Sequence, residues 1–133
     1  VLNKGTKSNL KKGMAVLHKN NMIGRIVEVN YLSSRALLIN DLNSKISVKI
    51  VPSGENAIMT GEGNNLASLD FLPKLSTIEN GNIVFTSGAD GIFKDGIPIG
   101  KIKKIEEKFY VEFFTDLNQV NYATIINHKN GVN

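Results

Sequence analysis

The chain has 133 residues, a mass of 14.6 kDa and an apolar content of 41%, which suits one domain or two small lobes that share a core. Sixteen Lys and Arg residues against twelve Asp and Glu residues leave a net charge of +4, and the basic residues are spread along the whole chain. The sequence has no cysteine, which excludes disulfides, thiolate catalysis and cysteine zinc sites. We therefore predict a folded domain with a mildly basic surface.

The N-terminus lacks the pattern of a secretory signal peptide, and no apolar run reaches the ~20 residues of a membrane-spanning helix. The chain begins at Val1 rather than Met. We expect it to be a piece of a longer protein in which a targeting or anchoring segment precedes this region.

Short segments rich in β-branched and aromatic residues recur along the chain without helical periodicity. The expected strands, in chain order, are 14–17, 23–29, 35–39, 46–51, 57–60, 66–71, 82–86, 97–105 and 109–115. Pairs such as Ser-Gly, Asn-Gly and Asp-Gly separate them, because Gly adopts the positive φ that tight turns require. Short strands at regular spacing predict an all-β fold of barrels or a sandwich, since a parallel sheet needs intervening helices.

An internal repeat relates the two halves of the chain. Each copy has a turn glycine, an apolar strand, a loop, a strand of the pattern apolar–Gly–basic–Ile, and an apolar strand that ends at Asp. The matching segments are 12–17 with 80–85, 22–26 with 98–102, and 36–41 with 111–116.

The repeat predicts two related β-barrel lobes. We place the first lobe at residues 10–76 and the second at 77–133, and we expect residues 1–9 to cross over and complete the second lobe. Gly24 and Gly100 fall inside expected strands, where glycine marks a bend or a close approach of two backbones.

The segment Thr86-Ser87-Gly88 raises the question of a catalytic serine. His18 and Asp41 precede Ser87 in the His…Asp…Ser order of double-barrel serine proteases. However, neither Gly-Asp-Ser-Gly nor Gly-x-Ser-x-Gly surrounds Ser87, and the repeat gives Asp41 a counterpart in Asp116, which favours a turn role. We therefore predict that the chain has no catalytic residue and is not an enzyme.

The loop that contains Ser87 is predicted to be a structural turn. Its backbone is set by Gly88, Gly91 and Gly96, and Ser87 makes local hydrogen bonds. The two histidines, His18 and His128, have no metal-ligand spacing, and no glycine-rich loop opens a helix. We expect neither a metal nor a cofactor.

Alternation along 109–115 divides its side chains between two faces. Phe109, Val111 and Phe113 lie on one face, and Tyr110, Glu112 and Phe114 lie on the other. All the aromatics can serve as core packing. The alternative is a partner interface formed by Tyr110 and Phe114, together with Phe93 at the loop tip, because aromatics are favoured anchors at interfaces.

Several motifs form one specific combination that covers the chain from about residue 2 to near residue 115. They are Gly24-Arg25-Ile26-Val27-Glu28-Val29, Ser33-Ser34-Arg35, Asp41-Leu42-Asn43-Ser44, Leu72-Pro73, and the stretch from Thr86-Ser87-Gly88 through Gly91-Ile92-Phe93 to Gly96-Ile97-Pro98-Ile99-Gly100-Lys101-Ile102. This combination resembles the rod-shape-determining MreC family. Lys94 and the pair Ala89-Asp90 depart from the family pattern, which affects the shape of the loop.

The resemblance implies a pair of small β-barrels similar to the trypsin-like fold but without a catalytic site. It implies the extracytoplasmic region of a protein of the bacterial inner membrane, anchored by one N-terminal helix followed by a coiled coil. It also implies a scaffold of cell elongation that binds penicillin-binding transpeptidases, MreD and RodZ, and that associates with itself as a dimer or filament. Nucleic acid is not among the expected partners.

Two other classes of function remain open from the residues alone. A small barrel that binds nucleic acid fits the basic charge, although basic residues and aromatics are not interleaved in one stripe. A hydrolase on a double β-barrel fits the chain order of His18, Asp41 and Ser87.

Overall fold

The computed structural model describes residues 11–73, 76–88, 95–117, 124–127 and 131–132. Within these residues the fold is all-β and contains no α-helix, as predicted, and no helix there is long and apolar enough to cross a membrane. The strands are β1 (Ala15–His18), β2 (Asn21–Val29), β3 (Ser34–Leu38), β4 (Lys45–Val51), β5 (Glu55–Gly61), β6 (Leu66–Asp70), β7 (Ile83–Thr86), β8 (Pro98–Ile105), β9 (Lys108–Phe113), β10 (Thr124–Asn127) and β11 (Gly131–Val132).

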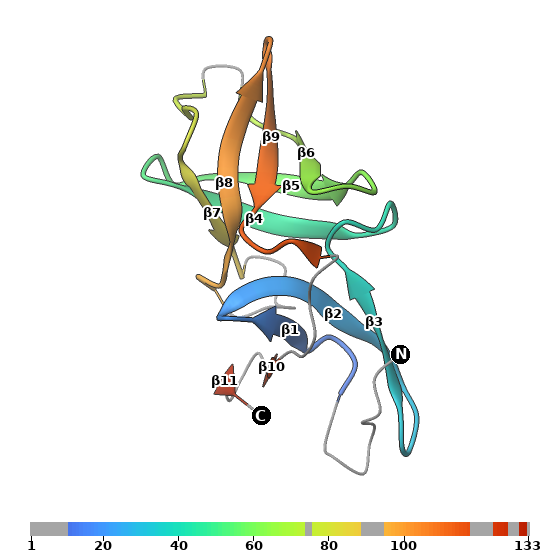
Figure 1. Cartoon of the computed structure of the whole chain (residues 1–133). Coiled ribbons are helices and arrows are strands. Elements are labelled where there is room, and N and C mark those ends of the chain that lie inside the picture. Colours follow the sequence, from blue (N-terminus) through green and yellow to red (C-terminus); the bar gives the residue numbers. More distant parts are fainter. Residues whose placement is uncertain (1–10, 74–75, 89–94, 118–123, 128–130, 133) are drawn as a thin grey trace.

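The strands form one closed barrel and one open sheet. The barrel has the order β4-β5-β6-β9-β8-β7, and the sheet has the order β11-β10-β1-β2-β3. Figure 1 shows the barrel in the upper half of the molecule and the sheet below it, with the β2–β3 hairpin extending away from the body. One of the two predicted lobes is therefore a closed barrel, whereas the described part of the other is an open five-stranded sheet.

The strand pairing corrects the predicted division at residue 76. Strands β4, β5 and β6 fall in the predicted first lobe, yet they form the barrel with β7, β8 and β9. Strand β10 falls in the predicted second lobe but pairs with β1. The physical reason is that a closed barrel leaves no unpaired strand edge, and six strands close where three cannot. The predicted crossover of residues 1–9 lies outside the described residues.

The internal repeat is confirmed at the level of individual backbone hydrogen bonds. Gly13 N donates to Ile26 O at 2.7 Å in the first copy, and Gly81 N donates to Ile102 O at 2.8 Å in the second. Both glycines have positive φ, +96° and +92°. In register, Val16 faces Gly24 just as Val84 faces Gly100, and each pairing is followed by a β-bulge. Strands β1–β3 and β7–β9 are therefore two copies of one three-stranded unit.

The two in-strand glycines sit where a neighbouring strand approaches closely. A Cβ placed on Gly24 would lie 2.7 Å from the carbonyl oxygen of Leu37, and one placed on Gly100 would lie 2.2 Å from that of Glu112. Leu37 and Glu112 are themselves repeat equivalents. This confirms the predicted close backbone approach at both glycines.

The sheet packs against the barrel through a shared apolar core. On the sheet, Ala15, Leu17, Met22 and Ile39 belong to the same buried cluster as the barrel interior. A smaller cluster of Met14, Val16, Ile23 and Ile26 fills the other face of the sheet. The fully buried barrel residues include Ile46, Val48, Ile50, Met59, Val84, Ile99, Ile102 and Val111. The shared cluster therefore holds the barrel, including strand β9, in a fixed position relative to the sheet.

Candidate functional site

Strand β9 divides its side chains as the sequence alternation predicts. Val111 is fully buried and Phe113 is 7% exposed inside the barrel, and Phe109 packs partly against the same core. Tyr110 lies on the outer face, half-buried, opposite Ser68 of β6 and Lys103 of β8. Phe114, just beyond the strand, is 43% exposed.

Tyr110 lines an open pocket of about 410 Å³ at one end of the barrel. Its apolar wall consists of Leu69 and Leu72 from the end of β6 together with Phe109 and Tyr110 from β9. The other lining residues are Glu62, Ser68, Asp70, Glu107 and Lys108. The pocket therefore combines apolar and aromatic side chains with a predominantly acidic rim, a composition suited to binding.

Phe114 lines a different pocket, of about 210 Å³, between the barrel and the β1–β2 turn of the sheet. The other residues of this pocket are His18, Lys19, Asn21, Thr115 and Asp116. The structure thus places Tyr110 and Phe114 on the outer side of β9 but in separate pockets. Phe93, the third residue of the predicted interface, lies outside the described residues.

The loop from Thr86 to Ile97 is closed by backbone geometry. Thr86 N donates to Ile97 O, and Ile97 N donates to the Thr86 hydroxyl, both at 2.9 Å. Gly88 and Gly96 have positive φ of +69° and +84°. Both values fit the predicted turn role of these glycines. Gly91, assigned the same role, lies outside the described residues.

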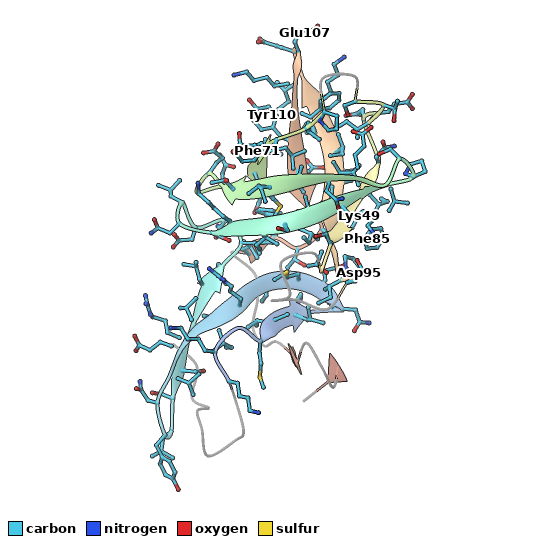
Figure 2. The ribbon with its side chains drawn as sticks, turned by 180° about the vertical axis from the view of Figure 1, so that it is seen from behind. Lys49, Phe71, Phe85, Asp95, Glu107 and Tyr110 are labelled. Carbon is cyan, nitrogen blue, oxygen red and sulfur yellow. The ribbon has the colours of Figure 1, made fainter. Side chains whose placement is uncertain are left out.

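Ser87 and the charged groups near it tie this loop to the barrel wall. Ser87 N donates to Ser47 O of β4 at 3.1 Å. Nearby, Lys49 Nζ of the same strand lies 3.9 Å from Asp95 Oδ1, and Figure 2 shows both residues beside Phe85. These contacts anchor the loop to β4 and give Ser87 a role in that anchoring.

His18, Asp41 and Ser87, which follow the chain order of a serine protease triad, lie in different structural settings. Asp41 Oδ1 accepts a hydrogen bond from Asn43 N at 2.8 Å in the turn between β3 and β4, as expected of an aspartate that forms a turn. The pocket lined by His18 contains neither Asp41 nor Ser87. Within the described part of the chain, no group of three His, Asp or Glu side chains is placed to hold a metal ion.

The lysines of β8 are engaged with neighbouring side chains. Lys101 and Lys103 each place their Nζ 3.6 Å from a carboxylate oxygen of Glu112, and Lys104 Nζ lies 5.7 Å from the centre of the Phe109 ring. One carboxylate therefore partly offsets the two lysines that a nucleic-acid surface would use. Strand β8 thus presents less positive charge to a nucleic acid than its lysines alone would indicate.

Glu55 joins the segment before β7 to strand β5. Its carboxylate accepts hydrogen bonds from the hydroxyl of Ser76 at 2.5 Å, from Thr77 N at 2.9 Å and from the Thr77 hydroxyl at 3.0 Å. These bonds, that from the Ser76 hydroxyl first, hold the pKa of Glu55 below its usual value of 4.5.

Sequence reasoning missed the most exposed apolar residue of the described chain, Phe71, which is 83% exposed. Alternation from Leu69 predicts that Phe71 points inward, but its φ of +67° ends the strand at Asp70 and reverses that expectation. Tyr31 and Leu32, 66% and 61% exposed at the tip of the β2–β3 hairpin, were also missed. Asn30 and Ser33, which flank these two residues, are typical of an exposed turn and could have indicated their exposure.

A closed six-stranded barrel packed on an open sheet defines this chain as an all-β barrel domain. The family model for the barrel core of the rod shape-determining protein MreC matches residues 1–127. The chain therefore belongs to the MreC family, as its sequence motifs indicate.

Curated relatives agree with this family. The cell shape-determining protein MreC of Caulobacter vibrioides is 32% identical over 126 residues, which cover 94% of this chain and 36% of that protein. MreC of Cereibacter sphaeroides is 28% identical over 127 residues, which cover 95% of this chain and 42% of the relative. The chain thus spans less than half the length of these two relatives.

Solved structures share the fold. The crystal structure of MreC from Pseudomonas aeruginosa aligns with a TM-score of 0.83 at 24% identity, covering 94% of this chain and 86% of that one. A complex between the penicillin-binding protein PBP2 and MreC, both from Helicobacter pylori, aligns with a TM-score of 0.64 at 19% identity, covering 88% of this chain and 80% of that one.

Proposed function

We propose that this chain is a non-enzymatic scaffold region of the bacterial cell-elongation machinery. In this proposal it controls cell shape by binding a penicillin-binding transpeptidase, an enzyme of peptidoglycan synthesis. It acts on the extracytoplasmic side of the inner membrane, in the periplasm where one exists, and the rest of the protein anchors it there. MreD, RodZ and further copies of the same protein, assembled as a dimer or filament, complete the set of partners.

The observation that carries this proposal is family membership across residues 1–127, combined with an aromatic pocket on the outer face of the barrel. A family member from Helicobacter pylori forms a complex with the penicillin-binding protein PBP2. The open pocket beside Tyr110 offers apolar and charged groups to such a partner. Phe114 and Phe93 extend the proposed interface.

Binding tests the proposal directly. The purified extracytoplasmic region of the elongation transpeptidase from the same bacterium is immobilised, and this chain is passed over it in a biolayer interferometry experiment. We expect saturable binding that weakens when Tyr110→Ser and Phe114→Ser are combined. Leu42→Ser, which removes a 65% exposed apolar side chain from the β3–β4 turn, serves as the control and should leave binding unchanged. No saturable binding at high protein concentration would contradict the proposal.

The absence of catalysis has its own test. A serine-reactive fluorophosphonate should leave the folded chain unlabelled, because neither Gly-Asp-Ser-Gly nor Gly-x-Ser-x-Gly surrounds Ser87. Labelling that Ser87→Ala abolishes would instead establish a hydrolase.

A further inference from the structure

Phe71 combines two features that seldom occur together. Its backbone adopts a φ of +67°, and its side chain is 83% exposed. Leu69 and Leu72, on either side, pack against the core. The positive φ turns the chain so that both leucines reach the core, and it leaves the phenylalanine ring outside.

The turn explains the conformation but not the choice of phenylalanine. Glycine, asparagine and aspartate adopt this backbone region with less strain than a bulky residue does. The exposed ring of Phe71 gains little from burial in the isolated chain, so folding does not account for it. A strained position that displays an aromatic ring points to a role outside the fold.

Phe71 stands next to the pocket beside Tyr110 in the chain, although it is not one of the residues that line it. Asp70 and Leu72, the two sequence neighbours of Phe71, both line that pocket. In the view of Figure 2, Phe71 and Tyr110 are seen near each other, and Glu107 is at the tip of the β8–β9 hairpin. The pocket and the displayed ring therefore form one surface, the Phe71 surface, which consists of Phe71 and the pocket-lining residues.

The residues that line the pocket carry a net negative charge, opposite in sign to that of the chain, although Lys103 of β8 faces Tyr110 and Lys104 lies over the Phe109 ring. Glu62, Asp70 and Glu107 line the pocket against the single base Lys108, whereas the whole chain carries +4. A cation that approaches the pocket meets carboxylates and the face of an aromatic ring, and both attract positive charge.

We propose that the Phe71 surface is the docking site for a segment of a partner protein in which an apolar or aromatic side chain is flanked by arginine or lysine. The apolar side chain enters the pocket between Leu72 and Tyr110 and packs against Phe71. The flanking cations pair with Asp70 and Glu107. The inference rests on the proposed function in that the segment belongs to a protein partner of the scaffold.

The first experiment uses peptide probes and the isotope-labelled chain in an NMR titration. The probes are three acetylated, amidated pentapeptides: Gly-Arg-Trp-Arg-Gly, Gly-Glu-Trp-Glu-Gly and Gly-Arg-Ser-Arg-Gly. We expect the first to shift amide signals of residues 68–72 and 107–110, with an affinity at least about tenfold above that of either other peptide. Equal affinities for the arginine and glutamate peptides, or shifts elsewhere only, would overturn the proposal.

Variants separate the site from general surface effects. Phe71→Asn removes the ring but suits the positive φ, so the chain should fold, as a melting curve will verify. We expect it to weaken binding of the first peptide at least about tenfold, and Glu107→Gln to weaken it about threefold. Leu32→Asn, at an apolar position that is 61% exposed on the hairpin tip, should leave binding unchanged. Unchanged binding by Phe71→Asn would refute the site.

A second experiment distinguishes this inference from the proposed function. The same variants are tested against the immobilised transpeptidase region. Weaker binding by Phe71→Asn but not by Leu32→Asn supports both proposals. Binding that is unaffected by Phe71→Asn leaves the proposed function standing and excludes this surface as its transpeptidase site. Loss of concentration-dependent self-association in Phe71→Asn, seen by analytical ultracentrifugation, would identify a second copy as the occupant and overturn the assignment to a different protein.

Discussion

The two copies of the repeat, β1–β3 and β7–β9, have the same internal hydrogen bonds but different surroundings. Ile39 N donates to Ile23 O at 3.0 Å in the first copy, and Phe114 N donates to Ile99 O at 3.1 Å in the second. The second copy is closed into a barrel by β4, β5 and β6. In the first copy β3 is the edge strand of an open sheet, and β10 pairs with β1 at the other side.

This difference shows that the repeat encodes a three-stranded unit and not its closure. Closure depends on the three strands between the copies, which pair with the second copy at both of its edges, β4 with β7 and β6 with β9. The Phe71 surface lies on this closed barrel, where the end of β6 meets the β8–β9 hairpin. Among the described residues, β3 of the open copy pairs only with β2, so it can shift when a neighbouring group changes in size.

The largest expected effect comes from adding one methyl group at the paired glycines. Gly100→Ala should destabilise the fold by about 3 kcal/mol or more, because its Cβ would lie 2.2 Å from Glu112 O inside a closed barrel. Gly24→Ala should cost only about 1–2 kcal/mol, because its Cβ would lie 2.7 Å from Leu37 O and the edge strand β3 can shift. Urea denaturation of both variants tests this order, and equal losses would mean that closure does not stiffen the second copy.

A medium loss of stability is expected from a change in the loop between β7 and β8, which is longer than its counterpart in the first copy. Gly88→Val should cost about 1–3 kcal/mol, because φ is +69° and the new Cβ would lie 3.1 Å from Asp95 Cβ. Thermal unfolding measures the loss. A Gly88→Val protein as stable as the wild type would remove the structural role given to this glycine.

Ser87→Ala should have a smaller effect, about 1 kcal/mol or less, because the amide that binds Ser47 O remains. Binding to the transpeptidase region should not change. A variant that is fully folded yet fails to bind would show that Ser87 acts in function and not only in anchoring.

The smallest effect concerns pH. The pKa of Glu55 is lower in the folded chain than its usual value of 4.5, because Ser76 and Thr77 donate to the carboxylate. The carboxylate therefore adds stability at pH values above 4.5, and this contribution is lost as the pH falls through the lower folded pKa. Glu55→Gln should reduce the difference in melting temperature between pH 7 and pH 3. An unchanged difference would show that these hydrogen bonds have no net effect.

The sequence allowed prediction of nine strands, the repeat, and the roles of Gly24 and Gly100, because these depend on local pattern and on comparison of one segment with another. It did not allow prediction of which strands pair across the copies, since pairing of β4 with β7 depends on the closure of a barrel and not on local composition. Strand β10 was missed because its four residues, Thr124–Asn127, carry no strong turn signal on their N-terminal side.

For the candidate site, alternation placed Tyr110 correctly on the outer face of β9. Nothing in the sequence indicated that Phe71 is exposed, because a single residue of positive φ interrupts the two-residue period and a phenylalanine carries no sequence signal for that conformation. The pocket also joins residues from the end of β6 with the β8–β9 hairpin, which are about forty positions apart in the sequence. Only the folded barrel brings them together.

Hydrogen–deuterium exchange of the chain with and without the transpeptidase region tests most directly the proposal that the partner binds the closed barrel and not the open sheet. We predict slower exchange at residues 66–72 and 107–114 in the complex, and unchanged exchange at the hairpin tip, residues 30–33. Protection at residues 30–38 of the open sheet, with none on the barrel, would contradict the account.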